Sequence, residues 1–231
     1  MSTEPSNQPD PWSTAKKTKN ETLYRDIDAE LTAGLERMKI EVTDAQRHAL
    51  VAYVLLLAKW NKAINLTAVR DPAQMVSRHM LDSLSIKEFV DFKSLIDVGA
   101  GAGLPGLPLA IVKPHMNVTL IDSVAKKTRF MQQVAAELKL ANVKVIHSRV
   151  EEVTLTAEAV VARAFASPAK LASLASHLLL PGGSLLAMVG VLPTTAELQE
   201  ISGYSLDKTA KLTIPDELAA RNIVVLERDP A

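Results

Sequence analysis

The sequence of 231 residues contains no cysteine, and this absence removes several kinds of chemistry. There can be no disulfide framework, no thiolate metal site and no cysteine nucleophile. The sequence also lacks a group of His, Asp and Glu with the spacing of metal ligands, so we expect no metal. Aromatic residues make up only 4%, and the two tryptophans, Trp12 and Trp60, are too isolated to form a base-stacking platform. Any chemistry here proceeds without a thiol.

Long apolar runs and an excess of one charge are absent as well. The longest apolar run, residues 49–58, is about half the length of a membrane-spanning helix, and residues 1–20 lack the apolar core of a secretory signal. We therefore expect a cytoplasmic protein with no membrane partner. The 26 Lys and Arg residues balance the 26 Asp and Glu residues, which argues against wholesale coating of nucleic acid but permits a local basic face.

Three segments of the chain differ in pattern. Residues 1–20 carry three prolines and almost nothing to bury, which predicts a flexible tail. Residues 21–93 place apolar side chains at three- and four-residue steps, with Thr43 as an N-cap and Asp71-Pro72 as a further helix start. This pattern predicts a helical N-terminal subdomain. In residues 94–231, short apolar runs alternate with amphipathic stretches, which predicts an α/β domain built from βαβ units.

The C-terminal segment predicts a seven-stranded, mainly parallel sheet with helices on both faces. The last two strands have no clear helix between them, so we expect antiparallel pairing at one edge of the sheet. The expected strands are residues 95–98, 118–121, 143–146, 159–162, 184–189, 210–214 and 223–226. The expected helices between the earlier strands are residues 107–112, 124–140, 169–180 and 195–201.

The strongest local signal is the segment DVGAGAGLPG, which runs from Asp97 to Gly106. A strand that leads into closely spaced glycines and then a helix brings a ligand against the backbone, because glycine takes positive φ freely and has no Cβ to obstruct the ligand. In doubly wound sheets such a loop lies at the carboxyl end of the first strand, beside the topological switch point.

One interpretation of this loop is a dinucleotide site. Gly101-x-Gly103-x-x-Gly106 matches the dinucleotide fingerprint, and Asp122 follows the second expected strand, where an acid binds a ribose hydroxyl. This interpretation indicates an NAD(P)-dependent oxidoreductase. A merely structural turn, or a regulator that binds nucleotide or RNA without catalysis, are further alternatives.

The other frame begins at the acid, Asp97-x-Gly99-x-Gly101-x-Gly103, which is the first-motif pattern of S-adenosylmethionine methyltransferases. An acid there suits a cofactor with a cationic amino-acid moiety better than it suits a pyrophosphate. Leu104-Pro105 also replaces the tight helix start that would point amide groups at a pyrophosphate. We therefore favour the methyl donor.

Several motifs beyond the glycine loop occur in a fixed order along the chain. They are residues 65–72 (NLTAVRDP), 78–83 (RHMLDS), 97–108 (DVGAGAGLPGLP), 120–127 (LIDSVAKK), 148–152 (SRVEE) and 163–166 (RAFA). In these motifs, and over about residues 22–228, the chain resembles the bacterial glucose-inhibited division protein B family. The members of that family are small-subunit ribosomal RNA guanine-N7 methyltransferases.

The resemblance implies a fold and an activity. The fold is a Rossmann-like class I S-adenosylmethionine-dependent methyltransferase domain, here over residues 94–231, with an N-terminal helical extension that helps to form the substrate cleft. The implied cofactor is S-adenosyl-L-methionine. The implied reaction is methyl transfer to N7 of one guanosine, position 527 of 16S ribosomal RNA in the small ribosomal subunit. We expect the protein to be a monomer.

The resemblance also implies roles for particular residues. The expected cofactor-binding residues are Asp97, Gly99, Gly101, Gly103 and Leu104 at the methionine part, Asp122 and Ser123 at the ribose, and Val150 and Glu151 at the adenine. Arg163 would face the junction of cofactor and substrate, where it would bind the cofactor and serve as a catalytic residue, and Asn65 would be the second catalytic residue. The expected substrate-binding residues are Asn65, Arg149, Arg221, Lys126 and Lys127. The family commonly has Lys-Gly after the fifth strand, where this chain has Val189-Gly190 and so lacks that basic side chain.

The chemistry of guanine N7 agrees with this composition. N7 is an exposed lone pair without a proton, so its methylation needs orientation rather than a general base. The site must also hold the edge of the base, and an arginine that donates to O6 suits this task. Carbon methylation of pyrimidines usually needs a cysteine, and exocyclic amine methylation is commonly marked by an Asn/Asp-Pro-Pro-aromatic turn. The chain has no cysteine and reads RAFASP at residues 163–168 instead.

Charge is distributed unevenly along the chain. Residues 113–149 hold seven basic and two acidic side chains, whereas residues from 194 onward hold four basic and seven acidic ones. A polarised surface of this kind could meet phosphates on one side. The alternative is that Lys126, Lys127 and Arg129 form only the solvated face of a helix.

Structural roles are the alternatives for the other candidates. His79 lies on an apolar helical stripe, which favours a hydrogen-bonded core histidine over a substrate contact. Asn65 could cap a turn, and Arg149 could pair with Glu151 or Glu152. Arg163 follows a buried strand, where an unpaired charge would be costly, and this favours a functional role.

Overall fold

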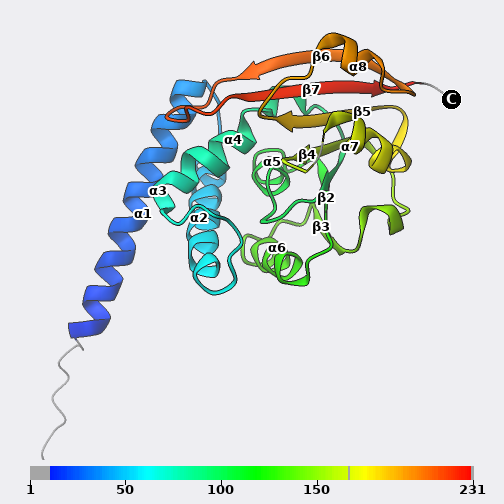
Figure 1. Ribbon diagram of the computed structural model, residues 1–231. Coiled ribbons are helices and arrows are strands. Elements are labelled where there is room, and N and C mark those ends of the chain that lie inside the picture. The colour runs from blue at the N-terminus through cyan, green and yellow to red at the C-terminus, as the bar shows by residue number, and fades with distance from the viewer. Residues whose placement is uncertain (1–10, 166, 230–231) are drawn as a thin grey trace, which may run out of the picture.

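A computed structural model describes residues 11–165 and 167–229 and contains a single seven-stranded sheet (Figure 1). The strands follow the order β3-β2-β1-β4-β5-β7-β6. Their bounds are β1 Ser94–Val98, β2 Asn117–Asp122, β3 Val143–His147, β4 Ala157–Arg163, β5 Leu179–Val189, β6 Tyr204–Leu212 and β7 Arg221–Arg228. The seven-stranded, mainly parallel α/β fold that the sequence predicts is therefore confirmed.

The helices surround this sheet. The longer ones are α1 Pro11–Met38, α2 Asp44–Ile64, α5 Gly106–Val112, α6 Ala125–Glu137, α7 Pro168–Ala175 and α8 Thr195–Gln199. Between α2 and β1 the chain forms a continuous series of short helical segments: α3 Pro72–Met75, the π-helix η1 Val76–Leu81, α4 Asp82–Leu84 and the 3-10 turn η2 Lys87–Phe89. Further 3-10 turns are η3 Val150–Glu152 and η4 Ser176–Leu178. No helix among the described residues is long and apolar enough to cross a bilayer.

Local sequence signals start the helices where they were expected. The hydroxyl of Thr43 accepts a hydrogen bond from the Gln46 N–H and completes a capping box with the Gln46 side chain. The Asp71 carboxylate accepts from the Ala73 N–H, with Pro72 at the first helical position of α3. Thr194 caps α8 in the same manner as Thr43 caps α2.

The topology places the reversal of strand order beside β1. Strand β1 pairs in parallel with β2 on one side and with β4 on the other, so chain crossovers leave in opposite directions from this point. Strand β7 is antiparallel to both β5 and β6, which confirms the antiparallel edge. The carboxyl ends of β1, β4 and β5 and the start of β7 thus meet at one edge of the sheet, which we call the carboxyl edge.

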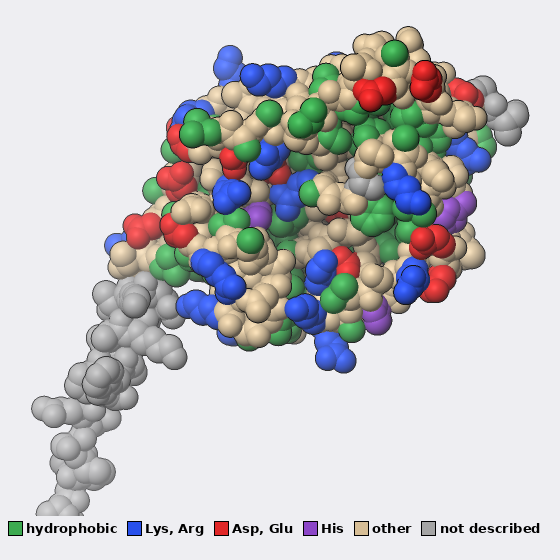
Figure 2. Space-filling view, viewed as in Figure 1, with side chains coloured by type: hydrophobic (Ala, Val, Ile, Leu, Met, Phe, Trp, Pro, Cys, Tyr) green, Lys and Arg blue, Asp and Glu red, His purple; other side chains and the backbone are tan. Residues whose placement is uncertain are grey.

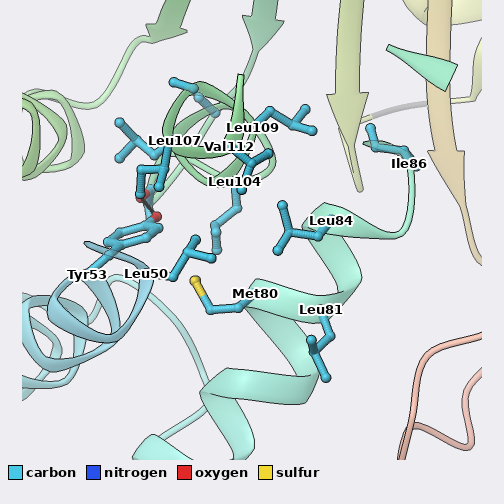
Figure 3. Packing of buried hydrophobic residues seen from close by; sticks show 14 of the residues in the cluster. Leu50, Tyr53, Met80, Leu81, Leu84, Ile86, Leu104, Leu107, Leu109 and Val112 are labelled. Atoms are coloured by element: carbon cyan, nitrogen blue, oxygen red, sulfur yellow. Dashed lines mark hydrogen bonds between the residues drawn. The ribbon is translucent and has the colours of Figure 1, made fainter. Parts of the chain in front are cut away.

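Both faces of the sheet are covered, and alternate residues of each strand point to opposite cores. The larger core packs α1, α2, α5 and α6 against residues such as Leu120 and Val161. The smaller core packs α7 and α8 against residues such as Val160 and Leu185. Figure 3 shows how α2 joins the larger core, with Leu50 and Tyr53 pointing toward the segment that leads into α5.

Three elements begin well before the positions that the sequence predicts. Strand β5 begins at Leu179, within the helix expected over residues 169–180, where Leu179 pairs with Ala157 of β4. Helix α1 begins at Pro11, so residues 11–20, which were expected to belong to a flexible tail, are helical, and residues 1–10 lie outside the described part. Residues 12–20 contain no glycine or proline, and a helix anchored by the packing of Ile27 and Leu31 extends without a new nucleation step. Strand β6 begins six residues before the expected start at residue 210, because it pairs along the whole of β7.

Candidate active site at the carboxyl edge

Two adjoining hollows open at the carboxyl edge. The first has a volume of about 620 Å³ and the second about 500 Å³, and both are bounded by Gly99, after β1, and Ala164, after β4. We call them the cluster hollow and the nucleoside hollow. On the face of the molecule in Figure 2, Lys and Arg side chains outnumber Asp and Glu around the centre.

A network of charged side chains forms one wall of the cluster hollow. Asp82, only 1% exposed, accepts a hydrogen bond from Arg163 Nη1 at 2.6 Å through Oδ2 and from Arg221 Nε at 3.0 Å through Oδ1. Glu217 Oε2 lies 3.3 Å from Arg78 Nε and 3.8 Å from Arg221 Nη2. These five residues, which we call the arginine cluster, join three segments that are distant in the sequence.

The fold brings the members of the arginine cluster together from three segments of the chain. Arg163 is the last residue of β4 and therefore lies at the carboxyl edge. Arg221 is the first residue of β7, and it lies at the same edge because β7 runs antiparallel to β5. Asp82 follows the π-helix η1, which also carries Arg78. Short π-helical insertions widen a helical turn and often occur at functional sites. The charge of Arg163 is therefore paired with that of Asp82. The argument from the sequence, that an unpaired charge after a buried strand favours a functional role, does not apply to Arg163.

His79 is held in a single protonation state and tautomer. Its Nδ1 lies 2.8 Å from the carbonyl oxygen of Arg78, which can only accept, so Nδ1 carries the proton. Its Nε2 therefore accepts from the Thr67 hydroxyl at 2.8 Å. Burial, and then the charge of Arg163, lowers the pKa of His79 from 6.5 to about 4. His79 is thus the hydrogen-bonded, neutral histidine expected from its apolar stripe, although its edge also borders the cluster hollow.

The glycine loop also lines the cluster hollow. Gly99, Gly101 and Gly103 all have φ between +62° and +87°, a region that side chains rarely allow. A Cβ at Gly101 would meet only the Gly99 carbonyl oxygen at 3.8 Å, so Gly101 faces open space in the hollow. A Cβ at Gly103 would instead clash with Leu107 at 2.3 Å, so Gly103 serves close packing against α5.

Asp97 lies beneath the glycine loop and not on the wall of either hollow. It is fully buried, and its Oδ2 accepts from the Gly106 N–H at 2.8 Å. Burial raises the pKa of Asp97 to about 7, and its Oδ1 has no partner among the described residues. The carboxylate thus occupies the first amide of α5, which a pyrophosphate would need, and this geometry disfavours the dinucleotide interpretation.

The residues expected at the ribose and the adenine come together in the nucleoside hollow, along with Arg149, which was expected to bind substrate. Asp122, Ser123, Val150, Glu151 and Arg149 all line it. The carboxylate of Asp122 accepts from the Gly101 N–H at 2.9 Å and from the Val124 N–H at 2.8 Å, and so ties the second strand to the glycine loop. No ion pair joins Arg149 to Glu151 or Glu152 among the described residues, so the structural alternative for Arg149 finds no support.

The lysines of α6 separate in the structure. Lys127 borders the nucleoside hollow and lies 3.4 Å from Asp122 Oδ2, so it forms an ion pair within the site. Lys126 is exposed and lines neither hollow. The two neighbours were expected to bind substrate together, yet successive helical residues point about 100° apart.

Asn65 does not join Arg163 at the cluster hollow. It ends α2 in the left-handed conformation, with φ 49°, and its Oδ1 accepts from Arg70 Nη2 at 2.8 Å. The following residues, Leu66 and Thr67, line the hollow instead. The buried amide of Asn61 holds this loop, since it donates to the Val69 carbonyl oxygen and accepts from the Thr67 N–H.

Phe165 lines the nucleoside hollow beside Gly99, which borders both hollows. Its ring packs so closely on Gly99 that an added Cβ would come within 2.4 Å of it. Ala164 before it has φ 51°, which is uncommon for a residue other than glycine and is found at strained functional sites. Val189 and Gly190 line the cluster hollow, so the departure from the family motif lies at the site.

Sequence reasoning missed Asp82, Thr67, Arg78 and Glu217 as site residues. One signal could have identified Asp82, because an acid within a helical stripe of apolar residues must find buried partners. Glu217 follows Asp216 in a loop with no motif, and the sequence holds no signal for its position.

Comparisons with known proteins agree with this geometry. The family model described as rRNA small subunit methyltransferase G (GidB) matches residues 46–224. The chain is 43% identical over 203 residues to ribosomal RNA small subunit methyltransferase G of Pseudomonas putida, covering 86% of this chain and 94% of the relative. The identity to the protein of the same name from Enterobacter sp. (strain 638) is 44% over 195 residues, covering 84% and 94%.

Solved structures match the fold at low sequence identity. TYW2 of M. jannaschii in complex with AdoMet has a TM-score of 0.53 and 17% identity, covering 66% of this chain and 76% of that chain. A SAM-dependent methyltransferase from Aquifex aeolicus has a TM-score of 0.51 and 17% identity, covering 68% and 93%. The match to the family model and the two relatives, each over most of the chain, show that this protein belongs to the rRNA small subunit methyltransferase G family.

Proposed function

We propose that this protein transfers a methyl group from S-adenosyl-L-methionine to N7 of guanosine 527 in 16S ribosomal RNA. The observation that carries the proposal is the cluster hollow, one cavity that both the glycine loop and the arginine cluster line. This arrangement provides a place for the methyl donor at the glycine loop and hydrogen-bond donors for a base at the arginine cluster.

The residues of the two hollows suit the donor. Gly101 leaves the space above it open, as a backbone cradle for a ligand requires. Asp122 and Ser123 would hold the ribose, and Val150 and Glu151 would flank the adenine in the nucleoside hollow. The methionine part would lie along Gly99, Gly101 and Leu104 in the cluster hollow. When bound, the donor supplies a methyl group on a cationic sulfur.

Asp97 and Gly103 act indirectly in this proposal. Because Asp97 is buried under the loop, its carboxylate positions Gly106 and the loop rather than contacting the donor from the cavity wall. Gly103 permits the close approach of Leu107. Both residues shape the cradle in which Gly101 lies.

The ionisable groups of the cluster hollow fit attack by a ring nitrogen that carries no proton. His79 is neutral and both its ring nitrogens are engaged, and the Asp82 carboxylate is bound by two arginines, so neither is free to act as a base. Arg163 uses Nη1 for Asp82 and the Arg78 carbonyl oxygen. Among the described residues its Nε and Nη2 have no hydrogen-bond partner, so they can donate to guanine O6.

Exposed basic side chains around the hollows support an RNA substrate. Arg149 is exposed at the nucleoside hollow, and Lys126 and Arg129 are exposed on α6. Helix α2 packs on α6 through Trp60 and Phe130, whose ring centroids are 5.7 Å apart, and carries exposed Lys59 and Lys62. Phosphates that approach the site would meet these cations first.

The test combines ligand binding with methyl transfer. Calorimetry with S-adenosylmethionine, S-adenosylhomocysteine and NAD should give binding for the first two only, and binding of NAD alone would overturn the proposal. Methyl transfer should then be measured on small subunits, on naked 16S RNA, and on each with adenosine at position 527. We expect 7-methylguanosine in a nuclease digest of the first or second substrate and none from the adenosine-substituted ones.

A further inference from the structure

The bonding of Asp82 goes beyond what a buried ion pair needs. Each of its two carboxylate oxygens accepts a hydrogen bond from one arginine. Arg163 is the last residue of β4, and Arg221 is the first residue of β7. Replacing a buried ion pair by apolar residues of similar volume is often neutral or stabilising, so stability alone is a weak reason to keep this group in the core. Its place on the wall of the cluster hollow points to a role in the site.

The charges on this wall explain what that role is. Arg78, Arg163 and Arg221 line the cluster hollow, and only Asp82 among its lining residues is a carboxylate, with Glu217 just behind Arg78 and Arg221. His79 stays neutral, and Asp97 and Asp122 lie outside this hollow. With both carboxylates ionised, the five residues of the arginine cluster carry one net positive charge, and without them three.

A methyl donor with a cationic sulfur would be repelled by three uncompensated arginines. A sphere of 620 Å³ is about 11 Å across, so any ligand in this hollow lies within about one Debye length of the arginine cluster. One unit charge at such a distance changes the affinity of a cation by about three- to thirtyfold, depending on the local dielectric constant. When N7 is methylated, the sulfur becomes a neutral thioether and the positive charge moves to the base that Arg163 contacts, so three uncompensated arginines would also oppose the transfer.

We infer that Asp82 is a positioning residue that fixes the guanidinium groups of Arg163 and Arg221 and supplies the counter-charge that lets a cationic donor bind beside them. Glu217 extends this counter-charge to Arg78 at the rim of the hollow. The inference rests on the proposed function, because it places the methyl donor in the cluster hollow.

A comparison of two ligands isolates this role. S-adenosylmethionine and S-adenosylhomocysteine differ in one methyl group and one positive charge. The dissociation constant of S-adenosylmethionine divided by that of S-adenosylhomocysteine therefore reports the electrostatic potential at the sulfur. In the isosteric variant Asp82→Asn we expect this ratio to rise three- to thirtyfold in favour of the neutral thioether. A merely structural role would weaken both ligands equally and leave the ratio unchanged.

A second substitution restores the charge without restoring the ion pair. In Asp82→Asn with Arg221→Gln, the cluster regains its original net charge, so the ratio should return to within about twofold of wild type. The matched control is Asp28→Asn, which also removes a carboxylate from a partly buried arginine pair, with Arg47, away from both hollows. It should leave both dissociation constants unchanged.

Glu217→Gln keeps the inference testable if Asp82→Asn does not fold. Glu217 lies at the edge of the arginine cluster, so its neutralisation should raise the ratio in the same direction by a smaller factor. An unchanged ratio in a folded Asp82→Asn or Glu217→Gln protein would overturn the inference. If wild type binds neither ligand, or if Gly101→Ala leaves both affinities unchanged, the proposed function fails instead, and the two failures are thus distinguishable.

Discussion

The hydroxyl of Tyr53, on helix α2, donates a hydrogen bond to the carbonyl oxygen of Ala102 at the centre of the glycine loop, and both residues are buried. This bond joins the helical N-terminal segment to the loop that lines the cluster hollow. Burial raises the pKa of Tyr53, so its proton stays in place throughout the accessible pH range. The N-terminal helices therefore help to fix the shape of the donor cradle.

Tyr53→Phe should loosen that cradle. The substitution leaves the buried Ala102 carbonyl without its donor, which costs about 1–3 kcal/mol of unfolding free energy and should raise the dissociation constant of the donor several-fold. Chemical denaturation and calorimetry measure the two effects. Tyr204→Phe is the matched control, because the buried Tyr204 hydroxyl has no partner among the described residues and nothing is orphaned by its removal. Equal effects in the two variants would contradict a role for the Tyr53 bond.

Gly101→Ala should impair donor binding more than stability. Gly101 has φ 62° and Gly182 has φ 71°, so alanine at either position meets a similar backbone strain of about 1–2 kcal/mol. Neither added Cβ meets a close neighbour, but only the one at Gly101 enters the cluster hollow. We expect the affinity for the methyl donor to be at least tenfold weaker in Gly101→Ala and unchanged in Gly182→Ala. Calorimetric titration measures the affinities, and chemical denaturation checks that the two variants have similar unfolding free energies. A shared loss would assign both glycines to folding.

Arg163→Lys tests the arginine at the end of β4 with its charge retained. Alanine would leave Asp82 with one partner only and confound stability with function, at a cost of up to about 3–5 kcal/mol. Lysine keeps the ion pair but loses the planar fork that reaches both Asp82 and the base. Methyl transfer should fall by about two orders of magnitude while the melting temperature changes by only a few kelvin.

The control for this substitution is Arg228→Lys. Arg228 ends β7 at the opposite edge of the sheet, where its Nη1 donates to the Leu179 carbonyl oxygen. It should retain the rate of wild type. If Arg163→Lys also retains that rate, Arg163 has only a structural role.

The glycine loop and the strands could be predicted because their signals are local. A glycine pattern such as that from Gly99 to Gly103 occupies a few consecutive residues, and the alternation of strand and helix follows from periodicity. The arginine cluster could not be derived in this way. Asp82 lies 81 residues from Arg163 and 139 from Arg221, and only the closing of the sheet around β4, β5 and β7 brings them together.

Asp97 shows a second limit of sequence reasoning. The motif identifies an acid near the end of β1. Whether that acid faces a ligand or the core depends on which face of the sheet its side chain points to, since successive side chains of a strand alternate between faces, and on the turn that follows. Here it faces the core and binds Gly106. Asn65 is similar, because the cap that ends α2 turns its side chain toward Arg70 and away from the hollow that Leu66 and Thr67 enter.

Lys126→Gln should weaken RNA binding in a salt-dependent manner. If Lys126 contacts a phosphate, its removal should reduce the slope of log affinity against log salt by about one, with little change in donor affinity. Lys139→Gln is the control, since Lys139 is also exposed but lies past the other end of α6. RNA binding at several salt concentrations distinguishes them, and equal slopes for wild type and Lys126→Gln would show that this lysine is only a solvated helix residue.

The buried His79 should make the folded protein sensitive to acid. Its pKa is lowered from 6.5 to about 4, first by burial and then by the charge of Arg163. Between these values the unfolded chain binds a proton that the folded protein rejects, so its stabilising contribution is present above pH 6.5 and is lost as the pH falls toward 4. The loss is on the order of 2–3 kcal/mol.

The variant His79→Gln isolates this effect from other titrations. Glutamine can accept from Thr67 but does not titrate, so the difference in unfolding free energy between wild type and variant should shift toward the variant as the pH falls from 7 to 4. Asp97 changes the unfolding free energy with pH in the opposite direction. Its pKa is raised to about 7, so the stability of the folded protein that depends on the protonated carboxyl is lost as the pH rises through that value. It is present in both proteins and cancels in the difference. Exposed His115→Gln serves as the control, and a pH-independent difference for His79→Gln would show that the folded protein accepts the proton.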